Sequence, residues 1–344
     1  MLEIDGSYGE GGGQILRTAL AFSCLTNKPC RIVNIRRGRR KSGLMPQHLA
    51  AVRAAASISG AAVQGDEPGS TRIIFIPEGV RGGEFEFHIG TAGSVTLLLQ
   101  TLIPPLLLAD RPSRVTLTGG THVPFSPSFH YLAGVFVPVL RRLGGEVRLT
   151  INSYGFYPRG GGSVCAEILP TRGMRPLTLA SPGMVRRIIG CSAVGNLPLG
   201  IAERQRAAAR ATLAEWSGDS WPSAHIELLH VPGPGQGTFV FIQAETDTVP
   251  AGFTSLGARG KRAETVGSEA AQELCVHLST GAALDPHLAD QIVPFLALCP
   301  EESSFTTSRI TRHLLTNLWV INLFRPLHFQ VTGEEGQPGE VIVR

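Results

Sequence analysis

One order of secondary-structure elements recurs three times along the 344 residues of this chain. Each copy runs as a strand, a helix, a strand, a second helix and two closing strands, as the periods of its apolar residues indicate. Helices and strands that each bury one face imply two-layer units. We therefore expect an α/β fold of three βαβαββ-type units around a pseudo-threefold axis. Because the copies are only weakly similar, three unrelated α/β segments remain the alternative.

The three copies place their elements at comparable intervals. The first has a helix opened by Gly11-Gly12-Gly13 and running through Ser23, a strand over 30–35, a helix over about 47–58 and a strand pair ending at 72–77. The second has a helix opened at 90–94 and running through Leu108, a strand over 114–118, a helix over about 128–143 and strands over 146–151 and 163–169. The third has a helix over 288–298, a strand over 304–308, a helix over 311–323 and strands over 328–332 and 341–344.

The segment from about 184 to 279 does not fit the repeat. It has strand and helix signals of its own, including a helical pattern over 202–216. We interpret it as a smaller α/β domain inserted into the third unit. The large domain then comprises residues 1–183 and 280–344, and a total of 344 residues agrees with about two domains.

Composition excludes several classes of protein. A net charge of +4 permits an anionic partner but is too low for a protein that coats nucleic acid. The six cysteines are scattered without a CxxC pair, which predicts buried free thiols and a reducing cytoplasm. The N-terminus lacks a signal-peptide pattern. The longest apolar stretch, 97–109, is short and broken by two prolines, so we expect no membrane span.

We expect a glycine-rich turn to open a helix at the start of each unit. Glycines let backbone N–H groups approach an anion, and a helix N-terminus adds positive potential. The stretch Gly9-Glu10-Gly11-Gly12-Gly13-Gln14 is the densest of these turns. Its carboxylate, Glu10, is a candidate ligand for a divalent metal beside a phosphate. A purely structural turn is the alternative at each of these sites.

A cluster of cations follows the second strand of the first unit. Arginine and lysine occupy five of the six positions over 36–41, namely Arg36, Arg37, Arg39, Arg40 and Lys41. Arginine forks match phosphate oxygens. The cluster is short, which favours a grip on one strand end over a long duplex. A solvated surface loop explains the same residues.

A histidine stands at the start of the second helix in every copy, at His48, His130 and His313. Equivalent positions around an axis can face a common cleft, although a single helical histidine is usually a packed or surface residue. The common nucleotide and hydrolase motifs are missing from the sequence: GxxxxGK[ST], HExxH, GxSxG and a KxDG-type lysine. If the chain uses ATP, it does so outside those motifs.

Several motifs together resemble the RNA 3′-terminal phosphate cyclase family. They are the opening stretch 9–17, the stretch Gly155-Phe156-Tyr157-Pro158-Arg159-Gly160-Gly161-Gly162, the run from Arg36 to Leu49, Gly90-Thr91-Ala92-Gly93-Ser94, Leu288-Ala289-Asp290-Gln291 and His313-Leu314-Leu315-Thr316-Asn317. They occur in the family's order between about residues 3 and 332. The basic loop is richer in charge than many family versions.

The resemblance implies a catalytic mechanism in three steps. The histidine matching His313 attacks the α-phosphate of ATP, the adenylyl group moves to an RNA 3′-phosphate, and the vicinal 2′-hydroxyl closes a 2′,3′-cyclic phosphate and expels AMP. The resemblance also implies roles for other residues. They are ATP contacts at Gln100, His287, Leu288, Ala289, Asp290 and Gln291; phosphate-binding or supporting residues at Arg17, Arg36, Arg40 and Gln47; and Mg²⁺ or Mn²⁺ at Glu10. His287 stands where some relatives have an aromatic residue, so stacking on adenine is plausible there.

Two other functions share this architecture. Some relatives are non-catalytic ribosome-assembly factors that act as RNA- or protein-binding scaffolds and lack the nucleophilic histidine, whereas this chain has His313 in its motif. Enolpyruvyl transferases have similarly repeated α/β units but different motifs. We therefore expect a cytoplasmic enzyme that acts on RNA 3′-phosphate ends, as a monomer or a homodimer.

Overall fold

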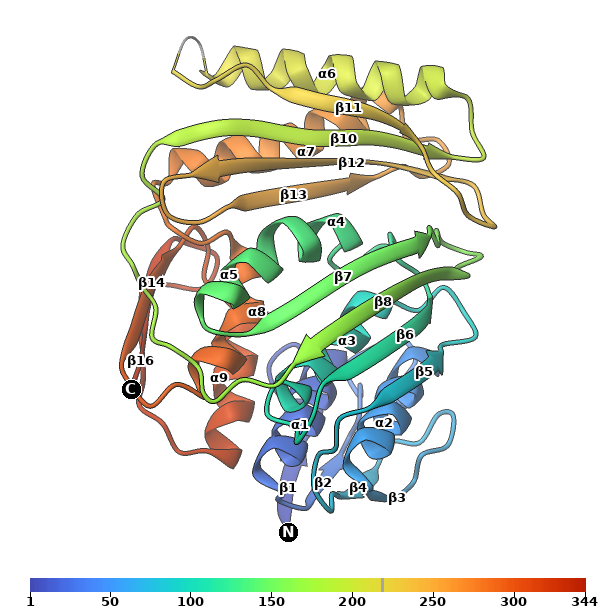
Figure 1. The fold of residues 1–344 in the computed structure, drawn as a ribbon, viewed down its shortest axis with the longest axis vertical. Helices are drawn as coiled ribbons and strands as arrows, with labels where there is room; N and C mark the ends of the chain where they lie inside the picture. Colours follow the sequence, from blue (N-terminus) through green and yellow to red (C-terminus); the bar gives the residue numbers. More distant parts are fainter. Residues whose placement is uncertain (218–219) are drawn as a thin grey trace.

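The computed structural model describes residues 1–217 and 220–344, and within these residues the strands form four four-stranded sheets (Figure 1). The first sheet contains, in spatial order, β1 (Leu2–Asp5), β2 (Cys30–Val33), β4 (Ile73–Ile76) and β3 (Ala62–Gln64). The second contains β5 (Glu84–His88), β6 (Ser113–Gly119), β8 (Gly162–Leu169) and β7 (Glu146–Ser153). The third contains β9 (Thr178–Leu179), β14 (Ser303–Thr307), β16 (Gly339–Val343) and β15 (Phe329–Thr332).

These three sheets have the same internal order. In each, the first strand pairs with the second in parallel, the second pairs with the fourth in antiparallel, and the fourth pairs with the third in antiparallel. The parallel pair needs a crossover, which the first helix of each unit supplies. The α/β class is therefore confirmed, while the pseudo-threefold axis stays a prediction.

The helices of the three units pack mainly against one another. They are α1 (Gly13–Thr26) and α2 (Pro46–Ser59) in the first unit, α3 (Val95–Leu106) in the second, and α8 (Pro286–Leu296) and α9 (Arg312–Phe324) in the third. α1 contacts α2, α3 and α9, and α8 contacts both α9 and α3. One side of this helix assembly supplies most of the candidate site.

The second helix of the second unit differs from the single α-helix that the sequence predicts. It runs as α4 (Phe129–Tyr131), the π-helical η1 (Leu132–Phe136) and α5 (Val137–Arg142). Pro138 has no N–H to donate to the carbonyl of Gly134, one turn earlier. A wider π turn before the proline accommodates that missing hydrogen bond.

The segment between β9 and α8 forms a sheet of another order. Its strands lie as β11 (His225–His230), β10 (Val185–Gly195), β12 (Gly237–Thr246) and β13 (Ala251–Leu256), with α6 (Leu199–Ser217) and α7 (Ala263–Ser279) packed against them. A separate apolar cluster, which includes Ile188, Val240 and Leu274, fills this unit. Figure 1 shows it in yellow and orange above α4 and α5. The domain limits at 184 and 279 stay a prediction.

All six cysteines are buried and free, as predicted. Among the described residues, no helix is both long and apolar enough to cross a membrane.

Candidate active site

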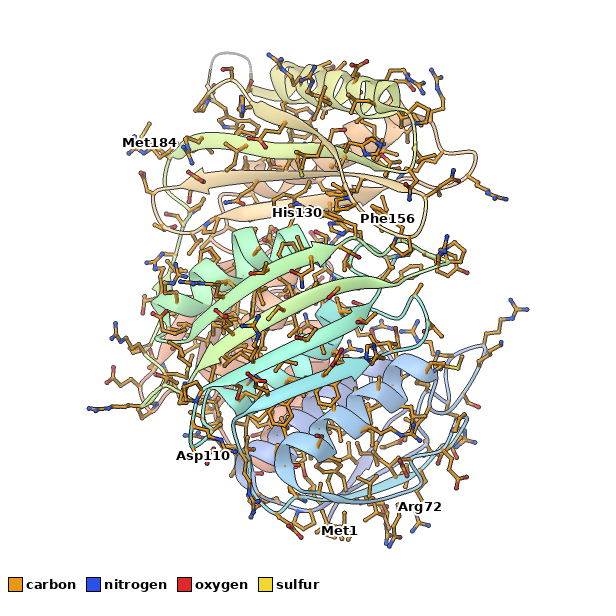
Figure 2. The ribbon with its side chains drawn as sticks, turned by 45° about the vertical axis from the view of Figure 1, so that its right-hand side comes forward. Met1, Arg72, Asp110, His130, Phe156 and Met184 are labelled. Carbon is orange, nitrogen blue, oxygen red and sulfur yellow. The ribbon has the colours of Figure 1, made fainter. Side chains whose placement is uncertain are left out.

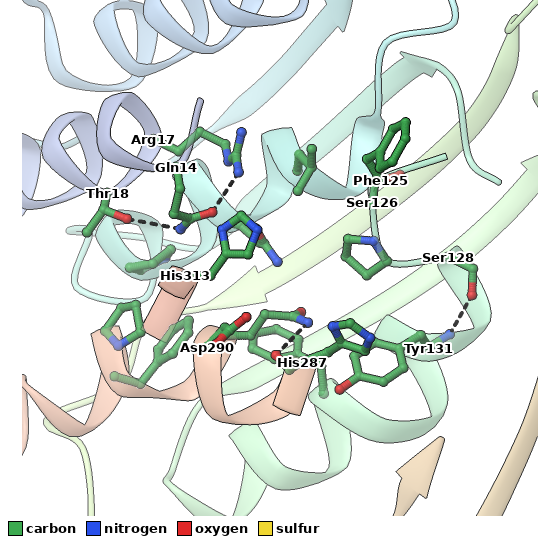
Figure 3. A pocket seen from close by; sticks show the side chains of 18 of the residues that line it. Gln14, Arg17, Thr18, Phe125, Ser126, Ser128, Tyr131, His287, Asp290 and His313 are labelled. Carbon is green, nitrogen blue, oxygen red and sulfur yellow. Dashed lines mark hydrogen bonds between the residues drawn. The ribbon is translucent and has the colours of Figure 1, made fainter. Parts of the chain in front are cut away.

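A cavity of about 420 Å³ opens where α1, α3, α8 and α9 meet the inserted sheet (Figure 3). Six of the residues that the sequence singles out line it: Arg17, Gln100, His287, Asp290, Gln291 and His313. The inserted unit adds a wall of its own, formed by Gly252, Phe253, Thr254 and Glu273. The volume is that of an ordinary small-molecule pocket.

His313 lies in the first turn of α9. The N-cap residue, Thr311, accepts a hydrogen bond from the N–H of Leu314 at 2.9 Å and so fixes where the helix begins. The His313 side chain is 49% exposed, and its Nδ1 lies 2.9 Å from Oε2 of Glu10. With Nδ1–H donating to that carboxylate, the Nε2 lone pair is left for chemistry.

Glu10 reaches His313 from a loop that only glycines can shape. Gly9 and Gly11 have φ values of 57° and 58°, in the left-handed region. A Cβ on Gly12 would lie 1.7 Å from Glu10 Oε1, and a Cβ on Gly9 would lie 2.6 Å from Thr316 Oγ1 of α9. The loop therefore seats against α9 because its glycines have no side chains.

The Glu10 carboxylate has two nitrogen partners. Oε2 faces His313, and Oε1 accepts from Arg39 Nη2 at 3.1 Å. Burial raises the pKa of Glu10, but the hydrogen bond and charge of His313 outweigh it, so the pKa is lowered. The same hydrogen bond raises the pKa of His313 against the opposing effect of burial. Both shifts favour the charged forms of the two groups, and the neutral imidazole with its proton on Nδ1 is the form that has a free Nε2 lone pair.

Arg17 is a buried cation with an unused donor. Its side chain lines the cavity from α1 and is only 8% exposed. Nη2 donates to Gln14 Oε1 at 2.6 Å, but Nε has no hydrogen-bond partner among the described residues. Burial lowers the pKa of Arg17 to about 10. A guanidinium held this way is costly unless an anion reaches it.

A polar network that the sequence does not predict joins α1 to α9. Asn317 Oδ1 accepts from Gln14 Nε2 at 2.9 Å and from Thr18 Oγ1 at 2.7 Å. Asn317 Nδ2 donates to the carbonyl of Asp290 at 2.7 Å. Through Gln14 the network continues to Arg17, as Figure 3 shows in part. The network aligns three helices, and its only sequence signal is that Gln14 and Asn317 belong to the motifs quoted above.

Asp290 is a largely buried acid at the centre of this arrangement. It accepts a hydrogen bond from Thr311 Oγ1. Burial raises the pKa of Asp290 to about 7, although Thr311 and the charge of His313 lower it. Its role as an ATP contact stays a prediction, and its titration has a consequence for stability.

We expect Asp290→Asn to stabilise the protein more at pH 8 than at pH 5. The folded pKa of about 7 exceeds the ordinary value of 3.8, so the folded state binds more protons between these values and stability falls as pH rises through this window. Asparagine carries no charge and escapes this loss, by about 1–3 kcal/mol at pH 8. Urea unfolding at both pH values measures the effect. An equal difference at both would contradict the raised pKa.

His287, Gln291 and Gln100 form the wall across from α1. The ring of His287 is open to the cavity, yet surrounding protein atoms desolvate it and lower its pKa to about 4, so it is neutral. Gln291 Nε2 donates to the His287 carbonyl at 3.0 Å. Gln291 Oε1 has no partner within residues 1–217 and 220–344. A buried amide oxygen without a donor carries a desolvation cost.

Other predicted residues lie outside the cavity. Leu288 and Ala289 are fully buried in the apolar core between His287 and Asp290, so their side chains do not face a ligand. Arg36 donates from Nη1 to the carbonyl of Gly43 at 3.2 Å, and Arg40 is exposed on the basic loop. Gln47 lies at the start of α2, and its Cβ would be 2.8 Å from a Cβ placed on Gly93. The roles of these five residues stay predictions.

The three repeated histidines do not share one cleft, because His313 alone of the three lines the cavity. His48 is buried, accepts from the Met45 N–H at 3.2 Å and has its pKa lowered to about 3 by burial, by Arg17 and by Arg36. His130 packs between the second unit and the inserted sheet (Figure 2), where its Nδ1 lies 2.9 Å from His122 Nε2. Equivalent positions thus serve packing in two units.

Known proteins resemble this chain along most of its length. The family model for RNA 3′-terminal phosphate cyclase matches residues 8–331. A relative from Methanopyrus kandleri, named RNA 3′-terminal phosphate cyclase, is 45% identical over 348 residues, covering 100% of this chain and 99% of the relative. One of the same name from Methylococcus capsulatus is 46% identical, covering 94% and 91%.

Among solved structures, the enolpyruvyl transferase NikO from Streptomyces tendae aligns with 99% of this chain and 65% of its own chain, at 14% identity and a TM-score of 0.28. That score is too low to support a statement about fold or function. The family model and the two relatives each cover more than nine-tenths of the chain. The chain therefore belongs to the RNA 3′-terminal phosphate cyclase family.

Proposed function

We propose that this enzyme converts an RNA 3′-terminal phosphate into a 2′,3′-cyclic phosphate at the expense of ATP, through an adenylylated His313. The observation that carries the proposal is the pairing of His313 with Glu10 at the cavity that also holds Arg17. A nucleophile and a buried cation line one pocket, and a carboxylate that is not itself part of the lining orients the nucleophile. The names of the relatives supply the reaction class.

In the first step His313 acts as a nucleophile. Its Nε2 lone pair attacks the α-phosphorus of ATP, a P–N bond forms, and the bond to the pyrophosphate oxygen breaks. Glu10 holds the imidazole in the tautomer that presents Nε2 and stabilises the positive charge that develops on the ring. Arg17 balances charge on the phosphates, which is the largest need in phosphoryl transfer.

The residues of the cavity fit ATP. The unpartnered Nε of Arg17 suits a phosphate oxygen, and the unpartnered Oε1 of Gln291 suits a donor on the base or the ribose. The neutral ring of His287, open to the cavity, offers a face or an edge to adenine. Gln100 lines the same space from α3.

Glu10 fits a divalent metal that is shared with the nucleotide. Among the described residues no group of three or more histidines, cysteines or carboxylates could form a metal cage. Mg²⁺ usually needs only one or two carboxylates and takes its other ligands from phosphates and water. Glu10, whose two oxygens keep further lone pairs beside His313 and Arg39, would hold such an ion. The ion would supply charge neutralisation at the phosphates.

The remaining steps transfer and then expel the adenylate. An oxygen of the RNA 3′-phosphate attacks the adenylate phosphorus, and the P–N bond to His313 breaks. The 2′-hydroxyl oxygen then attacks the activated 3′-phosphate, loses its proton, and AMP leaves. This closure is intramolecular, so orientation of the RNA end contributes much of its rate. The basic loop with Arg36 and Arg40 is our candidate for holding that end.

Covalent labelling tests the proposal directly. We expect the purified protein, incubated with α-labelled ATP and a divalent metal, to retain label after denaturation. The label should be labile to acid and stable to alkali, as a phosphoramidate is. A chase with 3′-phosphate RNA should discharge it and yield a 2′,3′-cyclic end, whereas a 3′-hydroxyl RNA should not. Folded protein that takes no label with any metal would favour a non-catalytic scaffold.

A further inference from the structure

Phe125 is the most exposed large apolar side chain among the described residues, at 102%. It belongs to the loop between β6 and α4 and lines the edge of the cavity together with Ser126 and Pro127. Figure 3 shows its ring across the pocket from Arg17 and Gln14. An exposure this high means that the protein shields neither face of the ring. The fold therefore gains no burial from this phenyl group.

The backbone conformation of Phe125 is also energetically unfavourable. Its φ is 61°, in the left-handed region that bulky residues other than glycine rarely adopt. Polar contacts on both sides hold it there: Ser126 Oγ donates to the Val123 carbonyl at 2.9 Å, and Thr96 Oγ1 donates to the Pro127 carbonyl at 2.7 Å. The loop thus presents an aromatic ring rigidly, in a conformation that ring burial does not stabilise.

We infer that Phe125 is the stacking platform for the 3′-terminal base of the RNA, an inference that rests on the proposed function. An RNA end that must place its phosphate beside His313 brings its last base to the edge of the same cavity. Single-stranded ends are commonly held by stacking on aromatic side chains. Stacking accepts every base, because each has a π-face. The platform would fix the sugar and its 2′-hydroxyl without selecting a sequence.

The alternative partner for the ring is the adenine of ATP. A small ligand that fills a pocket has most of its surface enclosed by the walls. The walls here already offer the ring of His287, with Tyr131 edge-on to it at 6.2 Å between centroids, and the free acceptor of Gln291. The ring of Phe125 projects from those walls, so it can contact the part of a ligand that extends beyond the cavity. The RNA is the substrate that extends beyond it.

Phe125→Gly tests the inference, with Phe125→Tyr as the conservative control. We expect the glycine variant to raise the KM for a short 3′-phosphate RNA by about 5- to 100-fold, the range for loss of one base–aromatic stack. Self-adenylylation measured without RNA should not change. The melting temperature should be equal or higher, because glycine adopts the same φ without strain. Tyrosine should keep the KM of the parent.

An RNA whose last nucleotide lacks its base makes the test specific. The KM of the parent for this RNA should rise as much as the KM of Phe125→Gly rises for the intact RNA. Combining the variant with this RNA should raise the KM no further than either change alone. Equal KM values for parent and glycine variant on intact RNA would overturn the inference. So would a higher KM for ATP in self-adenylylation, since Phe125 would then contact adenine.

Binding measured without ATP separates this inference from the proposed function. Fluorescence anisotropy of the labelled 3′-phosphate RNA should show the same 5- to 100-fold loss of affinity in Phe125→Gly, whether or not the protein ever adenylylates His313. If the parent fails to take label but binds RNA through Phe125, the catalytic proposal fails and the platform stands. If the parent takes label and the variant binds RNA equally well, only the platform fails.

Discussion

Replacing His313 by alanine is expected to abolish covalent labelling by ATP and to lower the cyclisation rate by at least about 10⁴-fold, the scale seen when a catalytic nucleophile is removed. The loss should be this large because Glu10 and Asp290 would give acyl phosphates of different stability and Arg17 is not a nucleophile. Denaturing gels with α-labelled ATP and product analysis of 3′-phosphate RNA measure the two effects.

The fold should survive this substitution. The His313 side chain is 49% exposed in the first turn of α9, and alanine is a favourable helix residue. His225→Ala, at an exposed histidine of the inserted sheet, is the matched control and should keep full labelling. If His313→Ala still takes label with the same acid and alkali sensitivity, another histidine is the nucleophile. His287, which also lines the cavity, would then be the first to examine.

The order of elements was predictable because apolar periodicity is a local signal. α9 begins and ends within one residue of the predicted helix over 311–323, and β14 lies within one residue of the strand predicted over 304–308. The first strands of the later units were expected in this order, but no residue range was predicted for them. β9 has only two residues, which is too short to show an alternation of apolar and polar residues. β5 alternates glutamate with Phe85 and Phe87, so its sequence was sufficient to predict a strand.

The site was predictable only as far as its motifs extend. His313 and Arg17 belong to contiguous motifs, and the structure brings both to one cavity. The bond between Glu10 and His313 joins residues about 300 positions apart, and no local pattern specifies it. Likewise, no local pattern indicates that Phe253 and Glu273 of the inserted unit line the cavity. The left-handed backbone of Phe125 has no sequence signal, because phenylalanine rarely adopts it.

Arg17→Met should lower kcat/KM for self-adenylylation by about 10²–10³-fold while leaving the melting temperature unchanged or higher. The two effects have one cause. A guanidinium that is 8% exposed, with Nε unpartnered, destabilises the empty protein and attracts the phosphates of ATP. Methionine fills a similar volume without charge. Folding then no longer includes the cost of desolvating a guanidinium, and the phosphates of the nucleotide lose their counter-charge. Thermal unfolding and labelling rates measure both effects.

Anion binding distinguishes a role of Arg17 in binding phosphates from a purely structural role. Inorganic pyrophosphate should raise the melting temperature of the parent and have little effect on Arg17→Met, because stabilisation follows the affinity of the folded state for the ligand. Arg17→Lys should fall between the two, since it keeps the charge but loses the fork. Arg114→Met, at an exposed ion pair with Glu167, should behave as the parent. A melting temperature that drops in Arg17→Met with labelling intact would mean that Arg17 serves the α1–α9 network through Gln14 instead.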